Sequence, residues 1–316
     1  MKIKNSKIIV AVLSLSMILS ACGNKNDKAK EGSSNPTENA STANEKKDGD
    51  TKNSNQEDFD ITVVSREDGS GTRGAFIELV GLEEEKNGEK KDTTTDEAVV
   101  QNSTNGVMQT VSQDLSAIGY VSLGSVNDKV KKLKVEGKEA TDENIESGDY
   151  TLQRPFNLAF KKDKLDDLAK DFLAFVLSKD AQDIVEKEGY IKVESKQYKG
   201  KKIKGNLTIA GSTSVTPLME KLVEKYKDIN PDANIEIQST GSSSGIESTI
   251  SDVSQIAMAS RELKDDEKDK LQVEVLAKDG IAVIVNKDNS KLNDLTKDQL
   301  KEIFSGKIKN TADLSK

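Results

Sequence analysis

Short apolar runs rich in β-branched residues recur along this chain, each followed by a loop of Gly, Ser and Thr and then by a helix-like segment. Residues 61–64 and 207–210 are two such runs, and runs of this kind are typical of strands. Apolar residues at helical spacing follow both loops, and Pro217 fits the first turn of the second helix. Because strands that alternate with helices build a sheet covered by helices, the sequence predicts an α/β fold.

The same patterns predict further elements in both halves of the chain. Strands are expected at residues 118–122, 235–237, 256–260 and 281–285. Helices are expected at residues 106–115, as one or two helices within residues 165–188, and again after residue 245. Strands and helices thus continue to alternate, as the α/β prediction requires.

Three of the connecting loops have the composition of an oxyanion site: residues 69–72, 211–214 and 241–245. Each is expected to open a helix, where unpaired N–H groups and a partial positive charge attract anions. Glycine allows the backbone to approach closely, and Ser and Thr hydroxyls are short donors. One such loop alone is more often a helix cap. Three loops, together with the planar guanidinium of Arg66, favour a site for a small anion.

The composition excludes several other classes of function. The chain has no His, which removes the commonest general base, and a single Cys, which excludes an intramolecular disulfide or a thiolate metal cluster. A net charge of −8 argues against nucleic acid as a partner. The P-loop motif is absent, and since there is no His to activate a serine, a Ser–Lys hydrolase is the enzyme alternative. We expect a binding protein, not an enzyme, with no cofactor and no metal.

The N-terminus has the organisation of a lipoprotein signal. Lysines near the start precede a mostly apolar run at residues 8–19, which ends in Leu-Ser-Ala-Cys22 and resembles the bacterial lipobox. Residues 1–22 are therefore expected to be a signal peptide and lipobox, with Cys22 lipidated. The alternative is an ordinary signal peptide that contains a Cys. Residues 23–57 are polar and predict a disordered tether, which would hold the protein at the outer face of the cell membrane.

Several motifs together resemble the phosphate-binding protein of the high-affinity phosphate ABC transporter. They are LTIAGSTSVTPL at 207–218, TGSSSGI at 240–246, IAMASREL at 256–263, REDGSGT at 66–72, IGYV at 118–121 and IFSG at 303–306. The resemblance covers nearly everything after the tether. It implies phosphate as ligand, permease subunits as partners, and a two-lobe, type II periplasmic-binding-protein fold with hinge strands. It assigns phosphate binding to Thr213, Ser214, Ser242, Arg66, Ser70, Gly71 and Thr72.

The order of these motifs is rotated relative to that family. The family places GSTS first and RxxGSGT later, whereas here residues 66–72 precede residues 211–214. Each motif occurs once and none is missing, which predicts a circular permutation with the break between Lys316 and about Asp58. One lobe would then combine residues 58–155 with 287–316, and residues 156–286 would form the other. The anion loops would divide between the lobes, so that closure completes the site.

Arg261 marks a departure from the family pattern. Some members place an Asp after the Ala-Ser pair, where it accepts the proton of hydrogen phosphate. In this chain Asp68 or Glu262 would have to take that role, and Asp68 is also placed to brace Arg66. Arg261 itself is either an anion ligand or one half of an ion pair. The remaining alternatives are a receptor for another oxyanion, such as sulfate or molybdate, and a phosphate sensor or adhesin without a role in transport.

Overall fold

The computed structural model of the protein describes residues 57–86 and 89–315. The predicted signal peptide, Cys22 and nearly all of the predicted tether lie outside these residues. Within the described part of the chain, no helix is both long enough and apolar enough to span a bilayer.

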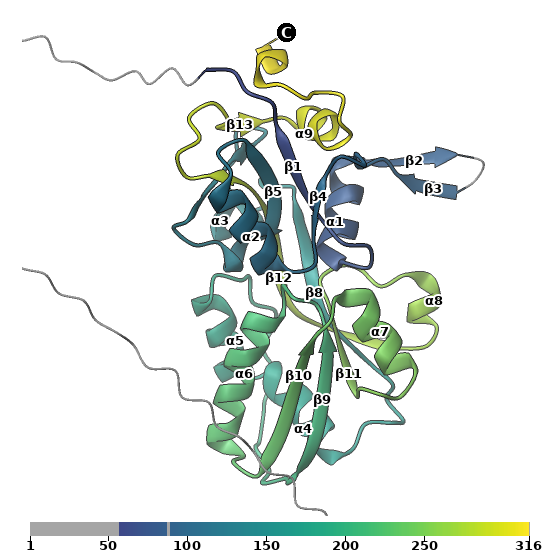
Figure 1. Ribbon diagram of the computed structural model, residues 1–316. Helices are drawn as coiled ribbons and strands as arrows, with labels where there is room; N and C mark the ends of the chain where they lie inside the picture. The colour runs from purple at the N-terminus through teal and green to yellow at the C-terminus, as the bar shows by residue number, and fades with distance from the viewer. Residues whose placement is uncertain (1–56, 87–88, 316) are drawn as a thin grey trace, which may run out of the picture. The chain divides into compact units, whose positions relative to one another are not determined.

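The described residues form a nine-stranded mixed sheet (Figure 1). Its strands are β1 (Thr62–Arg66), β4 (Val99–Gln101), β5 (Ala117–Ser122), β6 (Val130–Lys132), β8 (Gln153–Phe160), β9 (Gly205–Gly211), β10 (Ala233–Ser239), β11 (Ile256–Ala259) and β12 (Gln272–Asn286). The order is β10-β9-β11-β8-β12-β5-β1-β4, and β6 also pairs with β12. β10, β9 and β11 are parallel, and so are β5, β1 and β4. β8 and β12 lie between these groups and pair antiparallel with each other.

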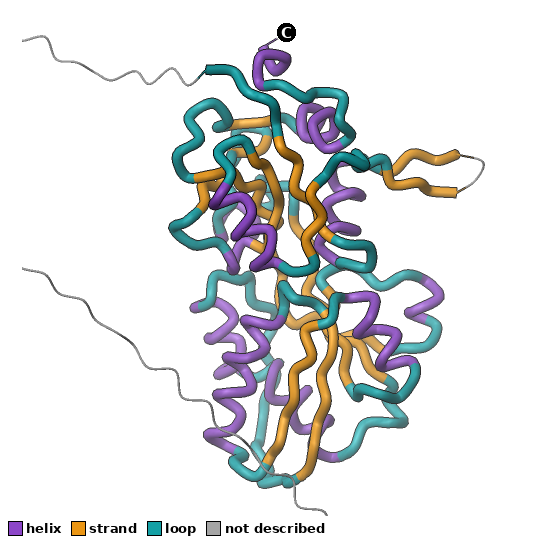
Figure 2. Tube along the Cα trace, in the orientation of Figure 1, coloured by secondary structure: helices purple, strands orange, loops and turns teal. Residues whose placement is uncertain are grey.

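Helices flank the strands on both sides (Figure 2). They are α1 (Gly71–Val80), α2 (Thr104–Gln113), α3 (Asp142–Glu146), α4 (Asp167–Val176), α5 (Lys179–Lys187), α6 (Thr216–Ile229), α7 (Ser242–Ile250), α8 (Asp265–Lys268) and α9 (Lys297–Phe304), with 3-10 turns at Leu123–Ser125 and Thr311–Ser315. Side chains of a strand alternate between its two faces. On β11, Ile256 and Met258 accordingly pack towards α4 and α6, and Ala257 and Ala259 pack against α7.

Two large hydrophobic clusters divide the core. The first takes its members from residues 63–152 and 281–304, and includes a stacked pair of rings, Phe76 and Tyr120, with centroids 4.0 Å apart. The second takes its members from residues 156–277. β8 and β12 pass from one cluster to the other, so residues 153–155 and 278–280 lie where the chain crosses between them. We call these six residues the crossover.

The two ends of the described chain lie side by side. Ile61 N–H donates to the Lys309 carbonyl at 2.7 Å, and Thr311 N–H donates to the Phe59 carbonyl at 3.0 Å. Asp60 and Asn310 form an antiparallel bridge between these two bonds. The first and last parts of the fold are therefore joined by backbone hydrogen bonds.

The predicted strands and helices are found close to their expected positions, and the α/β fold is confirmed. Two boundaries were clearly wrong: the helix expected after residue 245 begins at Ser242, inside the third loop, and the strand expected at residues 281–285 belongs to the longer β12, which begins at Gln272. Several strands were not predicted from the sequence: β4, β6, β8, and the short pair β7 (Lys134–Val135) and β13 (Asp294–Leu295). The hairpin of β2 (Glu83–Lys86) and β3 (Glu89–Asp92) was not predicted because every residue of both strands is charged.

Candidate anion-binding site

The first predicted anion loop joins β1 to α1. Arg66 is the last residue of β1, and a turn carries the chain to Gly71, where α1 begins. Ser70 caps this helix, because its hydroxyl accepts a hydrogen bond from the Arg73 N–H at 3.4 Å. The start of α1 therefore lies directly after the strand that holds Arg66.

The second and third loops have the same strand-to-helix arrangement. β9 ends at Gly211, and α6 begins at Thr216 with Pro217 in its first turn, where the missing N–H has no cost. α7 begins at Ser242, directly after Gly241. Gly241 has a φ of 93°, a left-handed backbone conformation that only glycine adopts without strain. Glycine there lets the chain turn sharply from β10 into α7.

Four hydroxyl groups from three segments meet at one point. The Thr72 and Ser214 hydroxyls share a hydrogen bond of 2.9 Å, and Thr104, the first residue of α2, lies 3.0 Å from Ser214 Oγ. The Thr104 and Thr213 hydroxyls are 3.2 Å apart. Thr72, Thr104 and Ser214 are buried, so these donors act where water screens them least.

Arg66 extends from β1 to the same cluster. Its Nη2 donates to Thr213 Oγ1 at 3.1 Å, and its Nε donates to the Gln101 carbonyl at 3.3 Å. Nε and Nη2 also donate to the two carboxylate oxygens of Glu67, at 2.8 and 2.9 Å. The guanidinium is only 2% exposed, and this fork fixes its plane.

A second group of hydroxyls lies beside the first. Ser212 Oγ donates to Ser260 Oγ at 2.9 Å, and the Ser260 N–H donates to Ser242 Oγ at 3.2 Å. Gly71 at the start of α1 touches this group so closely that a Cβ there would overlap Ser242 Oγ and lie 2.7 Å from Ser260 Oγ. The close approach requires glycine at this position, and it brings the N-termini of α1 and α7 together.

The arrangement suits a small, desolvated anion. The first turns of α1, α2 and α7 supply backbone N–H groups with a partial positive charge, and the hydroxyls add neutral donors. Glu67 balances the charge of Arg66, so most of the attraction comes from oriented dipoles. The chain has no His to activate a serine as a nucleophile. In the described residues, no group of three or more His, Cys, Asp or Glu side chains could hold a metal ion.

Comparisons with known proteins identify the family of this chain. Residues 34–180 and 196–314 match the PBP superfamily domain. A phosphate-binding protein PstS 2 of Streptococcus agalactiae is 53% identical over 259 residues, covering 81% of this chain and 88% of that protein. The chain belongs to the PstS family of phosphate-binding proteins.

Two further PstS-family matches come from Streptococcus pneumoniae. A phosphate-binding protein PstS 2 is 44% identical over 250 residues, covering 78% of this chain and 85% of that protein. The crystal structure of a phosphate-binding protein of a phosphate ABC transporter matches with a TM-score of 0.65 and 42% identity, covering 81% of this chain and 99% of that chain. The periplasmic-binding-protein fold implied by the resemblance is thus confirmed.

The structure brings most of the ligands assigned by the PstS resemblance together. The residues that meet are Arg66, Gly71, Thr72, Thr213, Ser214 and Ser242. Ser70 differs from them, because its hydroxyl caps α1. Phosphate binding by Ser70 and by the other six residues stays a prediction.

Two residues that contact the predicted ligands were not predicted from the sequence. Thr104 follows β4 and begins α2, with Ser103 as the cap, so it repeats the strand-loop-helix pattern of the other loops. Its signal was present in the sequence Asn-Ser-Thr-Asn-Gly but was weak because β4 has only three residues. Ser260 lies within the IAMASREL motif, and only the fold reveals its contact with Ser242.

The predicted brace for Arg66 was wrong. Glu67 makes the bidentate contact, whereas the Asp68 side chain is 98% exposed and lies 3.7 Å from Arg73. Asp68 is therefore also poorly placed to accept a proton from a bound anion.

Arg261 forms an ion pair in this structure. Its Nη1 and Nη2 donate to the two oxygens of Glu267 at 2.7 and 2.8 Å, and Nη2 also donates to Ser243 Oγ at 3.2 Å. Glu262, the other proposed proton acceptor, is exposed. Of the two readings of Arg261, the ion pair is the one observed, and through Ser243 it borders the first turn of α7.

Arg73 supports the loop from behind. Its Nη1 donates to the Arg66 carbonyl at 2.5 Å, and its Nε and Nη2 donate to Asp92 Oδ2 at 2.9 and 2.6 Å. Burial favours the neutral form of Asp92, but hydrogen bonds from Thr94 and Arg73 outweigh it and lower the pKa of this carboxyl. Arg73 thus ties the end of β1 to the base of the charged hairpin.

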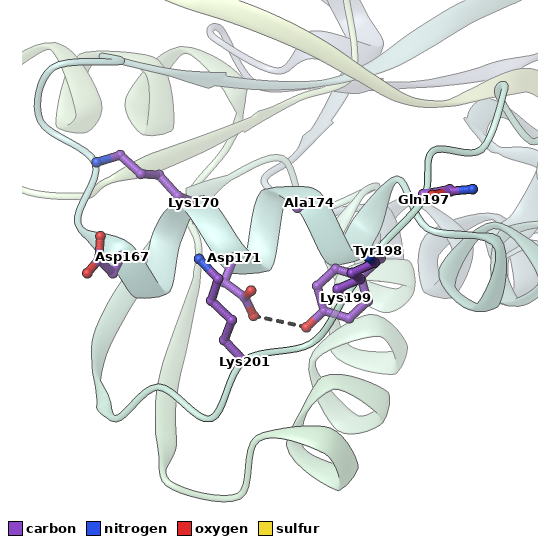
Figure 3. A pocket seen from close by; sticks show the side chains of 8 residues that line it. All are labelled: Asp167, Lys170, Asp171, Ala174, Gln197, Tyr198, Lys199 and Lys201. Atoms are coloured by element: carbon purple, nitrogen blue, oxygen red, sulfur yellow. Dashed lines mark hydrogen bonds between the residues drawn. The ribbon is translucent and has the colours of Figure 1, made fainter.

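A pocket of about 230 Å³ lies apart from these loops, between α4 and the segment that precedes β9 (Figure 3). In it Asp171 accepts a hydrogen bond from the Tyr198 hydroxyl at 2.9 Å (Figure 3). Asp171 also accepts one from the buried Tyr226 hydroxyl at 2.8 Å. The lining residues are Asp167, Lys170, Asp171, Ala174, Gln197, Tyr198, Lys199 and Lys201. None of them belongs to the anion loops, so this pocket is separate from the candidate site.

Proposed function

We propose that the protein captures inorganic phosphate and delivers it to the permease of an ABC transporter. The observation that carries this proposal is the buried meeting of Arg66 with the hydroxyls of Thr72, Thr104, Thr213 and Ser214 at the starts of helices. The PstS relatives, named as phosphate-binding proteins, support phosphate as the anion.

The site is proposed to close between two lobes, residues 58–155 with 287–316 and residues 156–286. The division into two hydrophobic clusters, joined by β8 and β12, supports this assignment. Arg66, Thr72 and Thr104 would come from one lobe, and Thr213, Ser214 and Ser242 from the other. Binding energy from phosphate would then favour the closed arrangement.

The circular permutation and the lipid anchor belong to the same proposal. Hydrogen bonds between residues 59–61 and 309–311 support the permutation, because permuted proteins need their ends close together. Lipidation of Cys22 and the tether at residues 23–57 would place the protein at the outer face of the cell membrane, beside the permease. The absence of His from the sequence supports a role in binding and not in catalysis.

Another oxyanion, such as sulfate or molybdate, is the second candidate. The observation that favours it is the arrangement of the carboxylates. Glu67 is held by Arg66, and Asp68 points to solvent, so neither is a free acceptor for the proton of hydrogen phosphate. Sulfate carries no such proton and needs only donors.

Isothermal titration of the purified protein with phosphate, sulfate and molybdate decides between these ligands. We expect phosphate to bind at a ratio of one and its affinity to survive an excess of sulfate. Tight sulfate binding that phosphate does not displace would reject phosphate capture. Absence of binding for all three anions would favour the adhesin alternative.

A further inference from the structure

A buried ion pair lies in the crossover, directly behind the anion site. Arg154 on β8 and Asp279 on β12 face each other across the two antiparallel strands. The Arg154 Nε and Nη2 atoms donate to Asp279 Oδ2 at 3.2 and 3.0 Å. The two side chains are 2% and 0% exposed, so this pair is removed from water where the chain passes between the hydrophobic clusters.

Each member of the pair also contacts one of the two halves of the fold. Asp279 Oδ1 accepts a hydrogen bond from Ser122 Oγ at 2.9 Å, and Ser122 ends β5 beside the first cluster. Arg154 Nη1 donates to the Ser260 carbonyl at 2.9 Å. Ser260 in turn donates its N–H to Ser242 Oγ in the anion site. A continuous polar chain therefore runs from β5 through the crossover to the start of α7.

Stability alone does not account for such a pair. Replacing a buried ion pair by apolar residues of similar volume is often neutral or stabilising, because desolvation offsets the attraction. A guanidinium fork, however, can hold a carboxylate and a carbonyl at fixed angles at the same time. Arg154 uses its fork in this way, with Asp279 on one side and Ser260 on the other. The geometry favours a role in orientation.

We propose that Arg154 and Asp279 are positioning residues for the anion site, which hold the Ser260 end of β11 against the crossover so that the Ser242 and Ser212 hydroxyls face the anion. This inference rests on the proposed function, because its effect is measured on phosphate binding. Neither residue needs to contact the anion: they act through Ser260.

The ionisation of Asp279 gives the link a pH dependence. Burial raises the pKa of this carboxyl to about 6, against the opposing effect of Arg154. The other titratable groups that face the pair are Tyr190 and Tyr150, whose phenols stay neutral, and Arg66, which adds positive charge near Arg154. Asp279 is thus charged at pH 7.5 and is neutralised as the pH falls below about 6, which weakens its bond with Arg154.

The sign of this effect separates positioning from simple stabilisation. A carboxyl whose pKa is raised above its ordinary 3.8 contributes stability below that value, and this contribution is lost as the pH rises through about 6. Mild acid therefore favours the folded state at Asp279 while it loosens the link to Ser260. A structural role therefore predicts that mild acid stabilises the protein, whereas a positioning role predicts that mild acid weakens phosphate binding.

The test compares the wild-type protein with the double variant Arg154→Met and Asp279→Val, which replaces the pair by apolar residues of similar combined volume and removes the polar link. We expect thermal unfolding at an unchanged or higher temperature, with a Kd for phosphate weaker by roughly ten- to a hundredfold, the loss expected for a charge-assisted hydrogen bond. Lys179→Gln with Asp183→Asn removes an exposed pair on α5 and is the control. A double variant that binds like the wild type overturns the proposal.

Arg154→Lys provides a second variant should the double substitution fail to fold. It keeps the charge but loses the fork, and we expect a Kd about tenfold weaker at pH 7.5. Between pH 7.5 and 5.5 the wild type should lose more phosphate affinity than either variant, since the titration of phosphate itself affects all three proteins equally. Equal losses in all three proteins, or an unchanged Kd in Arg154→Lys, contradict the positioning role.

Hydrogen exchange without any ligand separates this proposal from the proposed function. Amides of residues 256–263 should exchange faster in the variants than in the wild type, because the Ser260 carbonyl is released. If the wild type binds no phosphate but this exchange still rises, phosphate capture fails and the link to Ser260 is supported. Unchanged exchange overturns the link, whatever the wild type binds.

Discussion

At the scale of single residues, the site is built from hydroxyls that hydrogen-bond to one another. Thr104 shows this most clearly, because its hydroxyl shares hydrogen bonds with both Thr213 and Ser214 in another segment of the chain. Removing one such partner leaves the others buried with fewer hydrogen bonds. Each hydroxyl therefore affects the orientation of its neighbours as well as the anion itself.

Thr104→Val should weaken phosphate binding by about 1–3 kcal/mol, because it removes a buried donor and leaves the Ser214 hydroxyl short of a partner. Thr110→Val on the same helix is the matched control and should leave the Kd unchanged. Isothermal titration of both variants gives the comparison. Equal affinities in the two variants would show that Thr104 takes no part in binding.

Gly71→Ala should abolish tight phosphate binding, because the added Cβ overlaps Ser242 Oγ and pushes α1 away from α7. Gly74→Ala on the same helix is the control: its Cβ meets Arg261 Cδ at an ordinary 3.6 Å, and alanine favours a helix by up to about 1 kcal/mol. Titration and thermal unfolding of both variants test this. Retained affinity in Gly71→Ala would contradict the close approach.

How far the sequence predicts the site differs from residue to residue. Arg66, Thr72, Thr213 and Ser214 belong to compact motifs, so their positions could be recognised without a structure. Glu67 could not be chosen over Asp68 as the brace, because that choice depends on how the chain turns after β1. Contacts made through folding, such as that of Ser260 with Arg154, have no signature in the sequence.

At the scale of elements, local sequence patterns predict the helices and most of the buried strands. The other strands form because they pair with neighbouring strands. β8 contains a Pro and three polar residues and becomes a strand because β11 and β12 pair with it on both sides. The hairpin of β2 and β3 has no apolar residue and depends on cross-strand charge pairs and on Arg73 at its base. Such strands depend on their pairing partners in the sheet or hairpin, and the sequence alone does not identify those partners.

Asp92→Asn should lower the free energy of unfolding at pH 7 by about 1 kcal/mol, because it removes the charge that Arg73 binds at the base of the hairpin. The pKa of Asp92 is lowered in the fold, so this stability is present above the ordinary value of 3.8 and is lost as the pH falls below it. Urea unfolding at pH 7 and pH 3 measures the difference, with Asp96→Asn as the control. A difference that persists undiminished at low pH would refute this assignment.

At the scale of the whole molecule, segments at opposite ends of the sequence lie side by side in the fold. Motif order alone predicted the permutation, and the sequence could not tell whether residues 59–61 and 309–311 meet within one molecule. In the structure they do, through backbone hydrogen bonds. Hydrogen bonds therefore connect the two ends of the folded part at this point, although no peptide bond does.

A re-permuted variant tests this closure. Residues 57 and 315 would be joined by a short Gly-Ser linker, and new ends would be opened within residues 199–204, an exposed segment outside any helix or strand. We expect it to fold and to bind phosphate with the Kd of the parent, because permutation at such sites is tolerated. Opening the chain within β8 is the negative control. A folded variant with weakened binding would show that the present order of the chain matters to the site.

The pairing of the two chain ends also determines how the protein carries mechanical load. A pull applied through residue 57 enters the fold at Phe59–Ile61 and passes by backbone bonds to Lys309–Thr311, both beside the first hydrophobic cluster. The second cluster is joined to the first through β8 and β12 and lies apart from this entry point. A load that enters at residue 57 therefore reaches the first cluster before it reaches the strands that lead to the second.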